Sequence, residues 1–204
     1  QVLNSLKRET ESRISAGTKH NLLLAGQIML ITSLMLLLFL FLLLFRPQTF
    51  YDFRSVLFVL LMMLMMVSLA MLVLRYTSLS VYIVPFAILP IIVRTFFDSR
   101  TALFVHIITV LLISFMVPNP FEFVLLQLTI GMTAVYSLKD LTQRSQLMQA
   151  SLLIVLTYCL IYLSYSLIID GDVNKINWTV FFYFLINGLL LLFAYGLIYI
   201  FEKL

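Results

Sequence analysis

The residues from Leu22 to Phe45 read LLLAGQIMLITSLMLLLFLFLLLF, an apolar run of 24 residues without a charged side chain. As an α-helix with a rise of about 1.5 Å per residue, this run would be roughly 36 Å long. The hydrocarbon core of a bilayer is about 30 Å thick, so the run predicts a tilted transmembrane helix. The apolar residues are continuous rather than alternating, which argues against the strands of a membrane barrel.

The composition of the whole chain supports the same conclusion. Of the 204 residues, 63% are hydrophobic and 11% are charged. Soluble domains are about 45–50% apolar and about 25% charged. A water-soluble core of this size could not hide so much apolar surface, and a disordered chain would be far more polar. We therefore predict an all-α integral membrane protein whose main partner is the lipid bilayer.

Charged residues and prolines divide the chain into seven apolar segments. Four are long enough to cross a membrane unaided: 22–45, 56–74, 147–169 and 178–201. The three shorter segments are 79–93, 101–117 and 121–136. Each of these predicts a thin span, a span extended by its flanks, or a re-entrant segment. We expect a bundle of about seven transmembrane helices over residues 22–204, preceded at 1–21 by a connecting helix or the end of an extracytoplasmic domain.

Two prolines, Pro85 and Pro90, fall within the third segment. Proline lacks a backbone N–H and clashes with the preceding turn, so a kink or break is expected there. Such a kink either lines a functional site or is a packing feature in which a neighbouring helix satisfies the freed carbonyl groups.

The Lys and Arg residues of the short loops predict the orientation. If all seven segments span, one face holds seven cations: Arg46, Arg54, Arg94, Arg100, Lys139, Arg144 and Lys203. The opposite face holds only Arg75 and Lys175. By the positive-inside rule, the first face and the carboxyl terminus are cytoplasmic, and the amino terminus is outside. Four cations within residues 1–21 oppose this orientation, unless these residues end a large translocated domain.

Several catalytic motifs are absent from the sequence. The six glycines are too widely spaced for a phosphate-binding loop, and no GxSxG motif occurs. The two histidines, His20 and His106, lie in different segments without an HExxH motif. The basic residues do not form the clustered surface of a nucleic-acid binder. We expect no catalytic residue, metal ligand or bound cofactor within these 204 residues.

Four polar side chains lie inside apolar segments: Gln27, His106, Gln127 and Asn187. Polar groups are costly in lipid, so these side chains are expected to face the interior of the bundle. They either line a shared polar cavity or form separate interhelical hydrogen bonds worth about 0.6 to 2 kcal/mol each. No acidic residue lies in the middle of a segment, which argues against an ion-coupled transporter.

Two loops on the expected cytoplasmic face mix acidic and basic residues. Asp98 could pair locally with Arg100, or both could meet Lys139, Asp140 and Arg144 to form a docking surface for a cytoplasmic domain. The alternative is plain solvated charge that only sets the topology.

Three stretches of the chain carry a family resemblance: PIIVRTFFDSRTAL at 90–103, GMTAVYSLKDLTQRSQL at 131–147, and Asn187-Gly188 followed by FEKL at 201–204. In order and spacing they resemble the membrane region of the bacterial seven-transmembrane receptors with an intracellular HD hydrolase domain. The resemblance covers residues from about Gly26 to Leu204. Outside these short motifs, the similarity is that of generic hydrophobic helices.

The resemblance implies an extracytoplasmic domain before the seven helices and a cytoplasmic HD hydrolase after them. Members of this type look like cyclic di-AMP phosphodiesterases, which open the cyclic dinucleotide to linear pApA at a centre of two divalent metal ions. The start at Gln1 and the end at Leu204, directly after an apolar run, fit a part of such a protein. Catalysis would then belong to the full-length protein and not to this chain.

No catalytic or metal-binding residue of the family falls within this chain. The family-like positions are Asp98, Arg100, Gly131, Lys139, Arg144, Asn187, Gly188 and Glu202. The resemblance implies that these residues serve packing, loop conformation and coupling to the hydrolase.

The sequence therefore predicts a sensory or anchoring module of a multi-pass protein in the bacterial cytoplasmic membrane. Its expected partners are its own extracytoplasmic and HD domains and a second copy of itself. The main alternative is a small-molecule binding or transport module that resembles the substrate-capture subunits of bacterial vitamin importers. A scaffold for envelope machinery is the third hypothesis.

Overall fold

The computed structural model describes residues 2–137 and 144–203, and these residues contain helices and connections but no strand. The helices are α1 (Val2–Phe45), α2 (Pro47–Tyr51), α3 (Phe53–Tyr76), the 3₁₀ helix η1 (Val81–Ile83), α4 (Ile88–Phe96), α5 (Ser99–Ser114), α6 (Pro120–Ser137), α7 (Arg144–Asp170), the 3₁₀ helix η2 (Val173–Lys175), α8 (Thr179–Leu191) and α9 (Ala194–Lys203). The predicted all-α class is thus confirmed.

Within residues 2–137 and 144–203, four stretches are long and apolar enough to cross a membrane: Asn21–Phe45, Phe53–Tyr76, Gln146–Asp170 and Thr179–Ile198. They coincide with the four segments that the sequence marks as long enough to span unaided. Shorter apolar helices occupy Val81–Phe96 and Ser99–Ser114.

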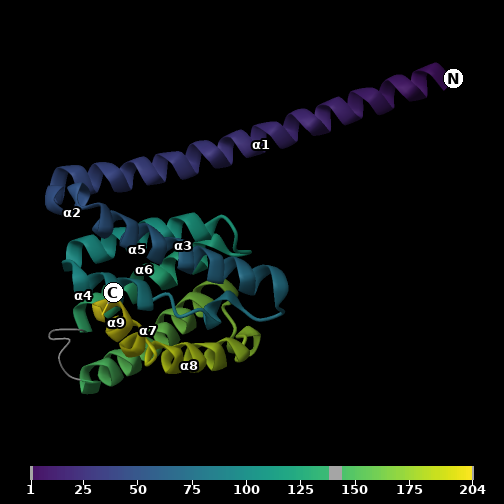
Figure 1. The fold of residues 1–204 in the computed structure, drawn as a ribbon. Coiled ribbons are helices and arrows are strands. Elements are labelled where there is room, and N and C mark those ends of the chain that lie inside the picture. Colours follow the sequence, from purple (N-terminus) through teal and green to yellow (C-terminus); the bar gives the residue numbers. More distant parts are fainter. Residues whose placement is uncertain (1, 138–143, 204) are drawn as a thin grey trace.

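Helix α1 has 44 residues and is therefore roughly 66 Å long, about twice the thickness of a hydrocarbon core. The polar residues that precede position 21 continue the same helix as the apolar run. Figure 1 shows that the amino-terminal half of α1 projects away from the other helices. The carboxyl-terminal part contacts α5, where the rings of Phe41 and Phe104 stack with centroids 4.0 Å apart.

The short helix α2 turns the chain from α1 into α3. Pro47 occupies its first turn, where a missing N–H costs no helical hydrogen bond. Asp52 then caps α3 by accepting hydrogen bonds from the backbone N–H groups of Arg54 and Ser55. These local signals make α3 run back beside the bundle.

The third apolar segment is broken, as its prolines predict. Residues 84–87 separate η1 from α4, and Pro85 lies within this break. Pro90 lies in the first turn of α4, where backbone N–H groups have no partner in the helix, so it does not interrupt α4. Pro85 is therefore the proline that coincides with the break.

The last predicted segment, 178–201, is not one continuous helix. It consists of α8 and α9, which are separated at Leu192 and Phe193. The backbone N–H groups of these two residues donate to Leu189 and Leu190, three residues earlier, in tight turns of the 3₁₀ type. Neither proline nor glycine occupies the two linking positions, so the sequence offers no signal for this interruption.

The core of the bundle lies between α4, α5, α6, α7 and α8. Phe86, Phe123 and Phe184 are among the largest fully buried side chains. In Figure 1, α2, α4 and the carboxyl terminus lie toward the left of the bundle. The connections from α3 to η1 and from α7 to α8 lie toward the right. Helix α9 contacts α4 at the left end.

Candidate functional site

A network of buried polar side chains surrounds the break in the third segment. Its members come from five helices: Tyr82 of η1, His106 of α5, Glu122 and Gln127 of α6, Tyr158 of α7 and Asn187 of α8. Each is at most 9% exposed. Buried polar groups must be hydrogen-bonded to offset the loss of water, so their partners determine how these helices pack.

Asn187 binds the broken backbone directly. Its Nδ2 atom donates to the carbonyl oxygens of Tyr82 at 3.0 Å and Val84 at 2.8 Å. The Val84 carbonyl group also accepts a hydrogen bond from the Phe86 backbone N–H at 2.9 Å. Because Pro85 has no N–H and the helix does not continue through this point, these carbonyl groups lack the usual helical donors. Asn187 supplies a donor from α8, which corresponds to the alternative in which a neighbouring helix satisfies the freed carbonyl groups.

Glu122 forms the part of the network that sequence reasoning missed. Its carboxylate accepts hydrogen bonds from the Tyr82 hydroxyl at 2.8 Å and from the Asn119 side-chain amide at 3.4 Å. It lies in the first turn of α6, where the helix dipole favours a negative charge. The available signal was an acidic residue two positions after Pro120, at the start of an apolar run.

Gln127 connects α6 to α5 and α7. The Tyr158 hydroxyl donates to the side-chain oxygen of Gln127 at 2.9 Å. The backbone oxygen of Gln127 lies 2.9 Å from Nε2 of His106, which donates if the proton is on that nitrogen. Within this network, three of the buried atoms that lack a hydrogen-bond partner in the described structure are His106 Nδ1, Gln127 Nε2 and Asn187 Oδ1. The three residues thus keep polar atoms without partners in the bundle interior.

Gln27 is not part of this network. Gln27 is exposed on α1. Of the four residues expected to line a polar cavity, His106, Gln127 and Asn187 are buried in the bundle, and Gln127 contacts His106. The hydrogen bonds of these three residues are interhelical.

Two glycines allow the close contacts within the network. A Cβ atom on Gly131 would overlap the ring of His106, and one on Gly188 would overlap the side chain of Val155. The carbonyl oxygen of Gly188 also accepts a hydrogen bond from Ser151 Oγ at 2.6 Å. Both glycines are family-like positions, and the structure gives each a packing role.

Asp98 forms a second polar contact at the end of the bundle where α4 meets α5. Its carboxylate makes an ion pair with Arg46, and caps α5 by accepting hydrogen bonds from Thr101 Oγ1 and the Arg100 backbone N–H. Burial raises the pKa of Asp98, but the hydrogen bonds from Thr101 and Arg46 and the charge of Arg46 lower it more, so the net pKa is below its ordinary value.

The Asp98 contact differs from the pairings considered in the sequence analysis. The ion pair of Asp98 is with Arg46, at the junction of α1 and α2, and the Arg100 side chain is exposed. Lys139 lies outside the described residues. The helices that carry Arg144 and Glu202 are described, but their side chains are not.

Among the described residues, no three His, Cys, Asp or Glu side chains are grouped as metal ligands.

Comparisons with known proteins identify one family. A family model described as "7TM receptor with intracellular HD hydrolase" matches residues 21–204. Neither the curated proteins nor the solved structures include a match to the chain.

Proposed function

Because the chain belongs to the family of 7TM receptors with intracellular HD hydrolase, we propose that it couples an outer domain to a cytoplasmic cyclic-dinucleotide phosphodiesterase. The observation that carries this proposal is the family match, which covers all seven apolar segments. In this function the chain is the transmembrane sensory and anchoring module of a bacterial inner-membrane protein. The HD domain would hold the divalent metal ions and hydrolyse cyclic di-AMP, while a second copy of the protein would complete a homodimer.

The proposed topology has seven spans, with the amino terminus outside and the carboxyl terminus in the cytoplasm. The ion pair of Arg46 with Asp98 brings two of the cation-rich loops together, as a shared cytoplasmic face requires. The short helices α5 and α6 have many buried residues, which fits short spans covered by neighbouring helices.

The proposed coupling runs between the two ends of the chain. Helix α1, which would continue from the outer domain, contacts the bundle through Phe41 and Phe104 and through the Arg46–Asp98 pair. Helix α9, which would lead to the HD domain, contacts α4. The helix before it, α8, is hydrogen-bonded through Asn187 to the break between η1 and α4. A movement of α1 would therefore act on packed elements that also hold α8 and α9.

The coupling is tested by hydrolysis of cyclic di-AMP by the full-length protein in lipid vesicles. Asp98→Ala would be compared with Arg75→Gln. The control removes an exposed cation from the last turn of α3. Each protein is assayed with and without the outer domain. We expect Asp98→Ala to reduce the difference that the outer domain makes, and Arg75→Gln to leave it unchanged. If Asp98→Ala hydrolyses cyclic di-AMP at the rates of the parent protein both with and without the outer domain, only an anchoring function remains.

The topology is tested separately by cysteine labelling in intact cells. Cysteines at Ser78, Asn119 and Asp172 would be introduced after Cys159→Ala removes the cysteine of this chain. The proposal requires all three to react with an impermeant maleimide from outside, and Arg100→Cys to react only after the cells are opened. Protection of Ser78→Cys or Asn119→Cys in intact cells would contradict the seven-span arrangement.

A further inference from the structure

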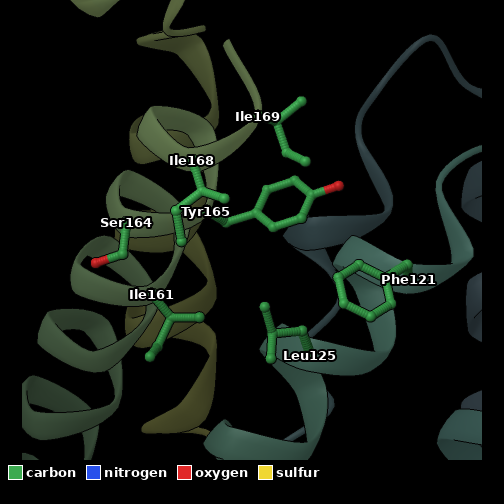
Figure 2. Close-up of a pocket in the computed structure, with 7 residues that line it drawn as sticks. All are labelled: Phe121, Leu125, Ile161, Ser164, Tyr165, Ile168 and Ile169. Atoms are coloured by element: carbon green, nitrogen blue, oxygen red, sulfur yellow. The ribbon is translucent and has the colours of Figure 1, made fainter. Parts of the chain in front are cut away.

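An apolar groove of about 290 Å³ lies where the start of α6 faces the second half of α7. Figure 2 shows the side chains that line it: Phe121 and Leu125 from α6, and Ile161, Ser164, Tyr165, Ile168 and Ile169 from α7. Its volume is close to the lower end of the range for small-molecule sites, about 300–1,000 Å³.

The surfaces that face the groove are almost entirely carbon. Ser164 is the only lining residue besides Tyr165 with a side-chain hydroxyl, and its Oγ donates to the carbonyl oxygen of Leu160 at 2.8 Å. In Figure 2 this hydroxyl points away from Phe121 and Leu125. The rings of Tyr165 and Phe121 lie across the space from their two helices, with centroids 6.2 Å apart. An occupant would therefore find hydrocarbon contacts and no charged partner.

The groove is continuous with an apolar surface that faces outward from the bundle. Phe121 is 71% exposed and Ile168 is 80% exposed. The stretch Gln146–Asp170 of α7 is long and apolar enough to span a membrane, yet only 22% of its apolar window is buried. For a helix in a bilayer, the material that covers such a surface is lipid hydrocarbon.

We propose that this groove binds one acyl chain of a membrane phospholipid. The concave shape and the two aromatic rings give a single flexible chain more contact than the convex surface of α7 beside it. The groove lies at the end of the bundle away from the Arg46–Asp98 pair. Resting on the orientation in the proposed function, this places the bound acyl chain in the outer leaflet.

The test uses the full-length protein in vesicles of phosphatidylethanolamine and phosphatidylglycerol. The vesicles contain a trace of phosphatidylglycerol with a photoactivatable diazirine on its acyl chain. After illumination, cross-linked peptides are mapped by mass spectrometry. We expect several-fold more cross-links within residues 121–125 and 161–169 than on the exposed apolar face of α1. Ile161→Trp, which fills the groove, should abolish this excess.

The matched control is Leu160→Trp, which places the same side chain at a 63% exposed neighbouring position outside the groove. It should leave the excess of cross-links unchanged. Cross-links spread evenly over all lipid-facing helices would overturn the proposal, because the groove would then hold only bulk lipid. Absence of lipid cross-links within residues 121–125 and 161–169 would also overturn it, because the groove would then be covered by something other than lipid. The readout does not depend on hydrolysis, so it distinguishes this proposal from the proposed function.

Discussion

The side-chain amide of Asn187 lies 3.0 Å from the backbone oxygen of Tyr82, a residue 105 positions earlier in the chain. The same nitrogen donates to Val84 at 2.8 Å, so one side chain of α8 satisfies two carbonyl groups at the break before α4. Tyr82 in turn donates its hydroxyl to Glu122 of α6. The broken segment is thus held from two sides by polar contacts inside an apolar bundle.

Replacing Asn187 by Leu should lower the stability of the protein. Both carbonyl groups would lose a buried donor. Val84 would keep its hydrogen bond from the Phe86 backbone N–H, so the main cost falls at the Tyr82 carbonyl, and an unsatisfied buried polar group costs about 1–3 kcal/mol. Thermal unfolding in detergent micelles measures the effect. Gln27→Leu is the matched control, because it also removes an amide but at an exposed position on α1. Equal melting temperatures for the two variants would contradict the role given to Asn187.

Gly131→Ala should destabilise the protein, because the new Cβ would overlap the ring of His106. Overpacking of this kind costs about 1–3 kcal/mol. Gly26→Ala is the control, since nothing lies within 4 Å of its added Cβ. Alanine is a better helix former than glycine, so Gly26→Ala should be neutral or stabilising by up to about 1 kcal/mol.

A double variant separates the overlap at Gly131 from a general effect of the substitution. His106→Ala removes the ring that the added methyl group would meet. The cost of Gly131→Ala should therefore fall in this background, which a double-mutant cycle on unfolding free energies measures. A cost that is the same with and without His106 would show that the ring contact is not its cause.

Tyr82→Phe should destabilise the protein by about 1–3 kcal/mol, because the buried carboxyl group of Glu122 would lose the donor at 2.8 Å. The ring and its packing against Phe184 would remain. Tyr136→Phe serves as control, because Tyr136 is 74% exposed on the same α6 that carries Glu122. A loss of stability in both variants alike would contradict a specific contact between Tyr82 and Glu122.

The ion pair between Arg46 and Asp98 should depend on pH in a defined direction. The pKa of Asp98 is lowered in the folded protein, so its contribution to stability is present above the unfolded pKa of about 3.9 and is lost as pH falls through the folded pKa. The side chains are 39% and 31% exposed, so we expect at most about 1 kcal/mol.

Asp98→Asn measures this contribution, because Asn preserves the ability to cap α5 but removes the charge. Its stability relative to the parent protein should be lower at pH 7, and the difference should shrink as the solution is acidified below about pH 4. Chemical unfolding of both proteins between pH 3 and pH 7 provides the comparison. A difference that grows on acidification would contradict the lowered pKa.

Local features of the sequence predicted much of the helical architecture. Apolar runs marked the four stretches that are long enough to span, and Pro85 marked the break in the third segment. These signals act within a few residues, through the length of an apolar run or the missing N–H of proline. The family resemblance added Gly131 and Gly188 as positions of interest, but not the side chains that they contact.

The tertiary structure decided which polar residues meet. Asn187 contacts the break, Asp98 pairs with Arg46, Glu122 joins the buried network, and Gln27 stays exposed. In helices that are apolar on nearly every side, no amphipathic stripe indicates which face turns inward. The rotation of each helix about its axis follows from packing against its neighbours, so contacts between distant residues depend on the assembled bundle.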